Sequence, residues 1–95
     1  MAVVGVLTLE LRIEGAHSLK DKRNVVRSLK DRLRSRFNVS VAEIGSQDTW
    51  QHAVVAVAAV SSDRVHAEGL LEAVEAEAAA ILGGDLADST VEWLA

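Results

Sequence analysis

The sequence predicts a ferredoxin-like α+β fold, in which a four-stranded antiparallel sheet carries two helices on one face. Two observations predict it. The periodic segments follow the order strand, helix, strand, strand, helix, strand, which is that of the split βαβ plan. The third of these strands is apolar on both sides, as expected for a central strand. No proline, repeat or low-complexity stretch marks a linker in the 95 residues, so we expect a single domain over residues 1–95.

The first half of the chain contains two strands with a helix between them. Residues 3–13 alternate in part between apolar and polar side chains, which is typical of a strand with one face in the core. Ser18 stands three residues before Asp21, which resembles a capping box and predicts a helix over residues 19–37. A second strand follows over residues 39–44. The apolar residues of the helix have spacings of three and four, and they predict one buried stripe: Val26, Leu29, Leu33 and Phe37.

The second half contains the central strand, a long helix and a closing strand. Alanine and valine occupy both sides of the strand predicted over residues 50–60. Three N-cap candidates, Ser61, Ser62 and Asp63, precede a helix that runs to about Leu82, and a pair of glycines ends it. Residues 87–94 form the last strand.

The sheet face without helices is predicted to be apolar. It would expose Val4, Val6 and one side of the third strand. A contiguous apolar face on a small domain predicts a homodimer formed sheet to sheet. The alternative is that these small side chains tolerate exposure to water.

Charge is divided unevenly along the chain, although the net charge is only −4. Residues 61–95 hold one arginine against eight acidic residues. Residues 20–36 hold eight of the ten basic residues against two aspartates: Lys20, Lys22, Arg23, Arg27, Lys30, Arg32, Arg34 and Arg36. This asymmetry indicates a polyanionic partner or self-association through opposite faces.

Four of these cations form a narrow stripe along the predicted first helix: Arg23, Arg27, Lys30 and Arg34. Their spacing suits the phosphates of a nucleic acid backbone, and Lys20 and Lys22 would add to the contact. One alternative is a solvated helix face whose aliphatic stems cover the edge of the core. Another is ion pairing across the helices with acidic residues of the second helix: Glu68, Glu72 and Glu75.

The start of the first helix is a second candidate site. Free backbone N–H groups and the helix dipole favour acidic residues there, yet three cations stand in the opening turns. A phosphate or carboxylate bound by Ser18, Lys20 and Arg23 would resolve this conflict. The alternative is compensation by nearby acidic residues: Asp21, Glu10 and Glu14.

The turn before the third strand is the densest polar and aromatic cluster. Its residues could contact a partner or ligand beside the sheet: Gln47, Asp48, Trp50 and Gln51. The cluster could equally form a hairpin turn in which Trp50 caps the core.

Motifs for catalysis, metals and cofactors are absent from the sequence. There is no cysteine, Walker loop, Gly-x-Gly-x-x-Gly motif or nucleophile elbow, and the three histidines lack metal-ligand spacing. We therefore expect no metal and no cofactor, and nothing indicates an enzyme. The first thirteen residues do not resemble a signal peptide, and no apolar run approaches the ~20 residues of a membrane span. We expect a cytoplasmic protein that does not enter a membrane.

Three motifs carry a resemblance to a known family: residues 18–23 (SLKDKR), residues 36–43 (RFNVSVAE), and residues 47–51 with their QD and WQ pairs. Together with the closing residues 92–94 (EWL), they resemble the YlxP-like family of small bacterial domains of unknown function. The resemblance implies a ferredoxin-like fold. It also implies a role linked to RNA or the ribosome, because genes of the family often lie near those for translation initiation and ribosome maturation factors. It carries over no catalytic residue.

The sequence favours a non-catalytic RNA- or ribosome-associated binding protein that uses its basic first helix. The third strand offers no aromatic platform for base stacking, so any contact would be to the nucleic acid backbone. One alternative is a structural, dimeric interaction domain whose basic helix docks on an acidic protein. The other is a module or enzyme for a small phosphorylated ligand.

Overall fold

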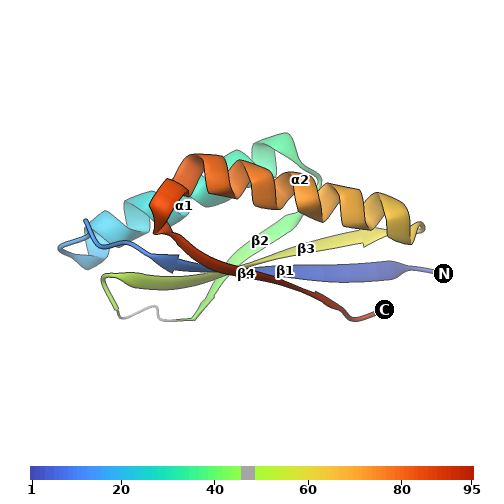
Figure 1. Ribbon diagram of the computed structural model, residues 1–95, viewed down its shortest axis with the longest axis horizontal. Helices are drawn as coiled ribbons and strands as arrows, with labels where there is room; N and C mark the ends of the chain where they lie inside the picture. Colours follow the sequence, from blue (N-terminus) through green and yellow to red (C-terminus); the bar gives the residue numbers. More distant parts are fainter. Residues whose placement is uncertain (46–48) are drawn as a thin grey trace.

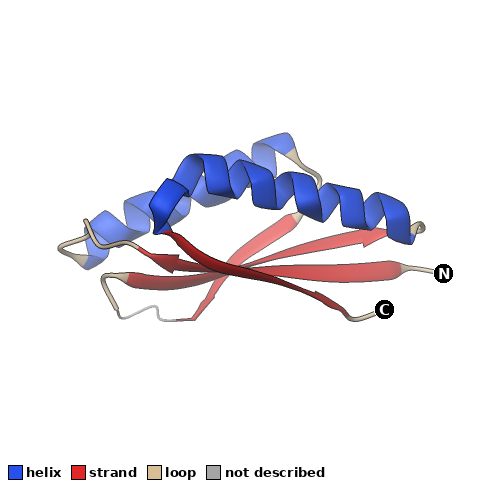
Figure 2. Cartoon of the chain, in the orientation of Figure 1, coloured by secondary structure: helices blue, strands red, loops and turns tan. Residues whose placement is uncertain are grey.

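The computed structural model describes residues 1–45 and 49–95 and contains two layers, a sheet and a pair of helices that lie on one face of it (Figure 1). The chain order is β1 (Val3–Arg12), α1 (Leu19–Arg36), β2 (Ser40–Gly45), β3 (His52–Ser61), α2 (Arg64–Leu82) and β4 (Leu86–Trp93). A short 3₁₀ turn, Gly83–Asp85, leads into β4. The antiparallel sheet has the strand order β2-β3-β1-β4, so the ferredoxin-like fold predicted from the sequence is confirmed (Figure 2).

The core lies between the sheet and the two helices. Strand β1 supplies Leu7, Leu9 and Leu11, which are fully buried, in the alternation that its sequence predicts. The apolar core residues of α1 and α2 are Val26, Leu29, Leu33, Ala67, Leu71, Val74, Ala78 and Leu82. Each fully buried leucine or valine contributes roughly 1.5–3 kcal/mol relative to exposure, so this layer interface holds the helices on the sheet.

Local capping sets the ends of the helices near the predicted positions. The Ser18 hydroxyl accepts a hydrogen bond from the Asp21 N–H at 3.1 Å, and the Asp21 carboxylate accepts one from the His17 N–H at 3.0 Å. These two bonds satisfy free donors at the start of α1. Asp63 caps α2 in the same way, and Gly83 ends α2 with a φ of 56°, a conformation that favours glycine.

The second face of the sheet carries no helix in the described part of the chain. Small side chains cross its centre in register, since Ala56 lies opposite Thr8 on one side and Ala42 on the other. Apolar residues surround them, and Ile44 and Val60 are 58% and 68% exposed. The predicted apolar sheet face is therefore present and open to water.

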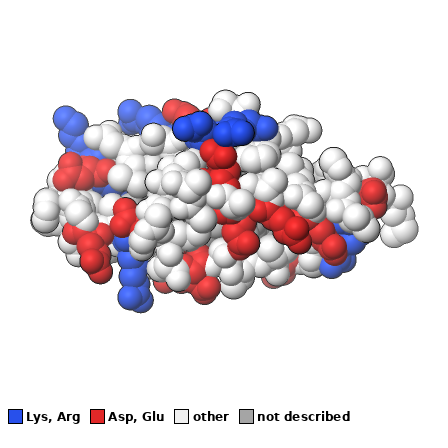
Figure 3. Space-filling model, turned by 45° about the horizontal axis from the view of Figure 1, so that its top comes forward, with Lys and Arg blue, Asp and Glu red and all other residues white. Residues whose placement is uncertain are grey.

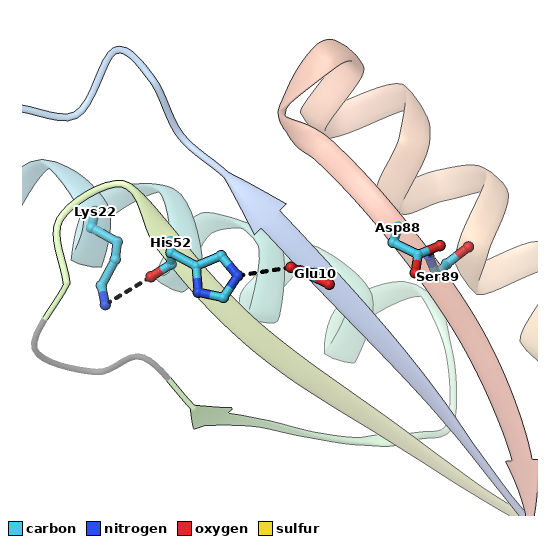
Figure 4. Close-up of polar contacts among 5 residues, drawn as sticks. All are labelled: Glu10, Lys22, His52, Asp88 and Ser89. Carbon is cyan, nitrogen blue, oxygen red and sulfur yellow. Dashed lines mark hydrogen bonds and ion pairs between the residues drawn. The ribbon is translucent and has the colours of Figure 1, made fainter.

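Lys22 is buried, although the sequence placed it among the cations that would contact phosphate. Its side chain is 1% exposed, and its Nζ donates to the backbone oxygen of His52 at 3.3 Å (Figure 4). The same Nζ lies 3.4 Å from Oε2 of Glu43. The reason is its position on the helix. Lys22 stands four residues before Val26, on the same stripe that faces the sheet. Lys22 therefore cannot reach a surface-bound polyanion together with the exposed cations.

The ion pair of Lys22 and Glu43 gives a stability prediction. Replacing Glu43 with alanine should lower the free energy of unfolding by about 3 kcal/mol, because it removes an anionic partner from a buried ammonium. Adding Lys22→Met should recover much of this loss, since methionine fills a similar volume without a charge. Urea denaturation measures both effects. Glu14→Ala is the control, because Glu14 is exposed and its loss should change stability by less than about 0.5 kcal/mol. A Glu43→Ala protein as stable as the wild type would contradict this role of the pair.

Candidate functional site

A groove of about 200 Å³ runs between α1 and the edge strand β2. It contains all four members of the cationic stripe predicted from the sequence, and we call it the cationic groove. Its lining residues are Arg23, Val26, Arg27, Lys30, Asp31, Arg34 and Glu43. Figure 3 shows lysine and arginine side chains gathered along the upper margin of the molecule, while acidic side chains form a band across its middle.

Arg34 fixes one end of the cationic groove. Its Nη2 donates a hydrogen bond of 2.6 Å to the backbone oxygen of Val41, on the edge strand β2. A guanidinium has five N–H donors, so this bond leaves others for an anion in the groove. The contact also covers part of an exposed strand edge, which would otherwise present open carbonyl groups.

The cationic groove contains acidic groups as well as basic ones. Asp31 and Glu43 contribute carboxylates to its lining. The Lys22 ammonium lies behind Glu43 and offsets its negative charge. Five cations therefore face two carboxylates when Lys22 is included, so the groove favours an anionic ligand.

The residues of the anion site predicted at the start of α1 lie beside an acidic side chain. The Ser18 hydroxyl is engaged by the N–H of Asp21, and the carboxylate of Asp21 occupies the first turn itself. Lys20 and Arg23 are exposed, and Arg23 belongs to the cationic groove. The alternative interpretation, in which Asp21 compensates the cations of the first turn, agrees with these contacts.

Within the described residues, no acidic residue of α2 forms an ion pair with the cationic stripe, which was one alternative considered from the sequence. Glu68 pairs with Arg64 on its own helix at 3.0 Å, and Glu75 accepts a hydrogen bond from the Ser89 hydroxyl. An ion pair does join the helices, but it links Arg36 to Glu77 at 3.1 Å. The stripe cations consequently face the groove instead of α2.

The polar and aromatic turn before β3 is only partly described. Gln47 and Asp48 lie outside the described residues. The Gln51 side chain donates to the backbone oxygens of Glu14 and Ala16, at 3.2 Å each, and so ties this turn to the loop after β1. Trp50 is 52% exposed, so the prediction that it caps the core is wrong.

Among the described residues, one histidine contacts a carboxylate. His52 lies on the open sheet face, where its Nε2 contacts Oε1 of Glu10 at 3.0 Å (Figure 4). Within residues 1–45 and 49–95, no three histidine or acidic side chains are grouped as a metal site requires.

None of the helices in residues 1–45 and 49–95 is long and apolar enough to cross a membrane.

Sequence reasoning missed a second groove on the other edge of the sheet, between α2 and β4. It has a volume of about 190 Å³ and combines an indole, three carboxylates and two aliphatic side chains. Its lining residues are Glu68, Leu71, Glu72, Glu75, Val91 and Trp93. The i, i+4 and i+7 spacing of the glutamates was visible in the sequence. The position of Trp93 beside them was not, because it depends on how β4 pairs with β1.

Several solved structures share the fold at low sequence identity. The de novo designed protein Foldit4 superposes with a TM-score of 0.64 and 16% identity, covering 100% of this chain and 98% of that one. A dimeric ferredoxin-like protein of unknown function from Thermobifida fusca has a TM-score of 0.53 and 15% identity, covering 97% of this chain and 91% of that one. A C-terminal segment of the alpha subunit of aIF2 from Pyrococcus abyssi has a TM-score of 0.55 and 14% identity, covering 98% of this chain and 49% of that one.

Sequence comparison identifies relatives more directly. The chain is 46% identical over 72 residues to the uncharacterized protein YlxP of Bacillus subtilis (strain 168), which covers 76% of this chain and 78% of that protein. This similarity confirms the resemblance seen in the motifs. Residues 4–91 match a family described as "Protein of unknown function (DUF503)". The chain therefore belongs to the DUF503 family of proteins of unknown function.

Proposed function

We propose that this protein is a non-catalytic RNA-binding protein that acts on the ribosome or its RNA through the cationic groove. The observation that carries the proposal is the collection of four cations in one groove beside α1. The cations from Arg23 to Arg34 extend over roughly 16 Å of helix. This length matches several phosphates, because duplex strands carry one charge per ~3.4 Å.

The shape of the groove favours an extended polyanion over a small ligand. Pockets for small molecules typically enclose about 300–1,000 Å³, whereas this groove has a smaller volume of about 200 Å³. None of the described residues that line it is aromatic, so they offer the bases of a bound strand nothing to stack on. The proposed contact is therefore with the phosphate backbone and tolerates many sequences.

We also propose that two copies of the chain associate through the open sheet face. The small residues at its centre, Thr8, Ala42 and Ala56, make that part of the face flat, so two copies can approach closely. A two-fold axis would pair each apolar patch with itself and remove both from water. The Thermobifida fusca protein with the same fold is dimeric. A role on the ribosome places the proposed dimer in the cytoplasm.

The RNA proposal predicts the effect of charge reversal in the cationic groove. The variant Arg27→Glu/Lys30→Glu should lose at least about tenfold in affinity for ribosomal RNA, because each reversed charge removes a phosphate contact and adds repulsion. Fluorescence anisotropy with bulk ribosomal RNA and purified subunits measures the affinity. For four phosphate contacts, the wild-type log–log salt slope should be near −3, since each contributes about −0.7 to −0.9.

A matched control distinguishes the effect of the groove residues on affinity from the effect of the total charge. Arg12 and Arg32 are exposed and lie outside the groove, so Arg12→Glu/Arg32→Glu makes the same change in total charge. This control should retain most of the affinity. Equal losses in both variants, or unchanged binding in the groove variant, would contradict the proposed interface. Salt-sensitive binding to an acidic protein but not to RNA would instead support the protein-docking alternative.

The dimer proposal predicts that a charge at the centre of the open face separates the copies. Ala56→Glu should convert the dimer to a monomer with little loss of stability, because Ala56 is already partly exposed in the single chain. Sedimentation equilibrium at micromolar concentration measures the mass. The control is Ala80→Glu, the same substitution on an exposed position of α2. A wild-type protein that sediments as a monomer at these concentrations would overturn the proposed dimer.

A further inference from the structure

We propose that the groove between α2 and β4 binds an extended cationic segment of a partner protein, which adds a strand to the free edge of β4. We call this site the acidic groove. It lies at the opposite edge of the sheet from the cationic groove, because β2 and β4 are the two edge strands. The proposal does not depend on RNA binding.

The floor of the acidic groove is apolar and held in place. Leu71, Val91 and Trp93 form it, and Val91 is 46% exposed. The indole of Trp93 lies directly on the backbone of β1 at Gly5, where an added Cβ would come within 2.6 Å of the ring atom Cζ3. Glycine at this position therefore allows the indole to lie on the sheet, which fixes one side of the floor.

The backbone of β4 offers hydrogen-bonding groups beside this floor. Leu94 donates its N–H to the oxygen of Val4 at 2.9 Å, so every second residue counted back from Leu94 directs its backbone groups toward β1. Antiparallel pairing alternates along a strand, and it turns the N–H and C=O groups of Val91 and Trp93 away from β1. Ser89 belongs to the same alternating set as Val91 and Trp93, and its N–H donates to the Asp88 carboxylate at 2.9 Å instead of to a β1 oxygen (Figure 4). No described strand lies beyond β4.

An added strand would direct every second side chain toward the acidic residues of α2. The residue opposite Val91 projects on the same sheet face as Val91, which is the face covered by the helices. Glu68, Glu72 and Glu75 line the groove on that side. Glu68 is already paired with Arg64. Glu72 and Glu75 are therefore the carboxylates that complement a segment with lysine or arginine at alternate positions and repel nucleic acid phosphates.

Arg64 demonstrates this recognition within the chain itself. Its guanidinium lies 3.8 Å from the centre of the Trp93 ring, and its Nε donates to the Glu68 carboxylate at 3.0 Å. Indole and carboxylate thus hold a guanidinium at one end of the acidic groove. An arginine of the partner would meet the exposed carboxylate of Glu72 further along the same groove.

The test uses the full chain, labelled with ¹⁵N, and a synthetic hexapeptide in which arginine and threonine alternate. Titration should shift the backbone amides of Val91 and Trp93 and leave those of the cationic groove in place. Glu72→Lys should weaken binding at least about fivefold, because it reverses an exposed charge in the groove. Asp31→Lys is the matched control on the other helix, and it should have a smaller effect. Equal weakening by the two variants would overturn the site.

Two further measurements test the added strand. Val91→Pro removes an outward N–H that the β1 ladder does not use, so it should abolish binding and preserve the fold. Circular dichroism checks the fold. Because proline could disturb β4, the second measurement leaves the protein unchanged and uses a hexapeptide with N-methylated arginine amides. This peptide should bind at least about tenfold more weakly if its N–H groups pair with β4. Equal affinity for the two peptides would overturn strand addition.

Discussion

The buried ammonium of Lys22 fixes how α1 sits on the sheet. A buried charge is stable only while its partners stay in place, and those of Lys22 are on β2 and β3. The helix cannot turn about its axis without withdrawing this charge from Glu43 and from the His52 carbonyl. The cationic groove depends on this orientation. Each groove cation directly follows a residue of the buried stripe in sequence: Lys22 and Arg23, Val26 and Arg27, Leu29 and Lys30, Leu33 and Arg34. A step of ~100° from the core stripe places all four beside β2.

The same ion pair sets the charge of the cationic groove. Glu43 faces both Lys22 and the groove, and alone it would oppose an anionic ligand. The buried lysine offsets the negative charge of this carboxylate. The exposed arginines and Lys30 therefore determine the electrostatic potential at the surface of the groove. Lys22 is thus lost as a surface contact but still supports the surface that the other cations form. A structural role and an electrostatic role coincide in one side chain.

Local periodicity explains how far the fold and this groove could be predicted. Leucines at alternate positions of β1 and the stripe of α1 led to the correct layers, and the helical period aligned the four cations. The burial of Lys22 was missed because lysine is rarely buried, although its spacing from Val26 and the matching parity of Val41 and Glu43 on β2 indicated it. The acidic groove could not be predicted in this way. It needs Trp93 to lie on Gly5, a contact between opposite ends of the chain that only strand pairing creates.

The sheet has two edges, and the helices beside them differ in charge. The basic helix α1 lies beside β2, and the acidic helix α2 lies beside β4. Four strands spaced ~4.8 Å apart separate β2 from β4 by about 14 Å. The Debye length at physiological ionic strength is about 8 Å, so neither groove cancels the potential of the other at its own surface. A net charge of −4 therefore describes neither edge. Because the open face lies on the other side of the sheet, a polyanion, a cationic segment and a second copy could each bind without displacing the others. Such a domain is suited to joining an RNA to a protein, and the two charged partners would select their edges by electrostatic attraction before any close contact forms.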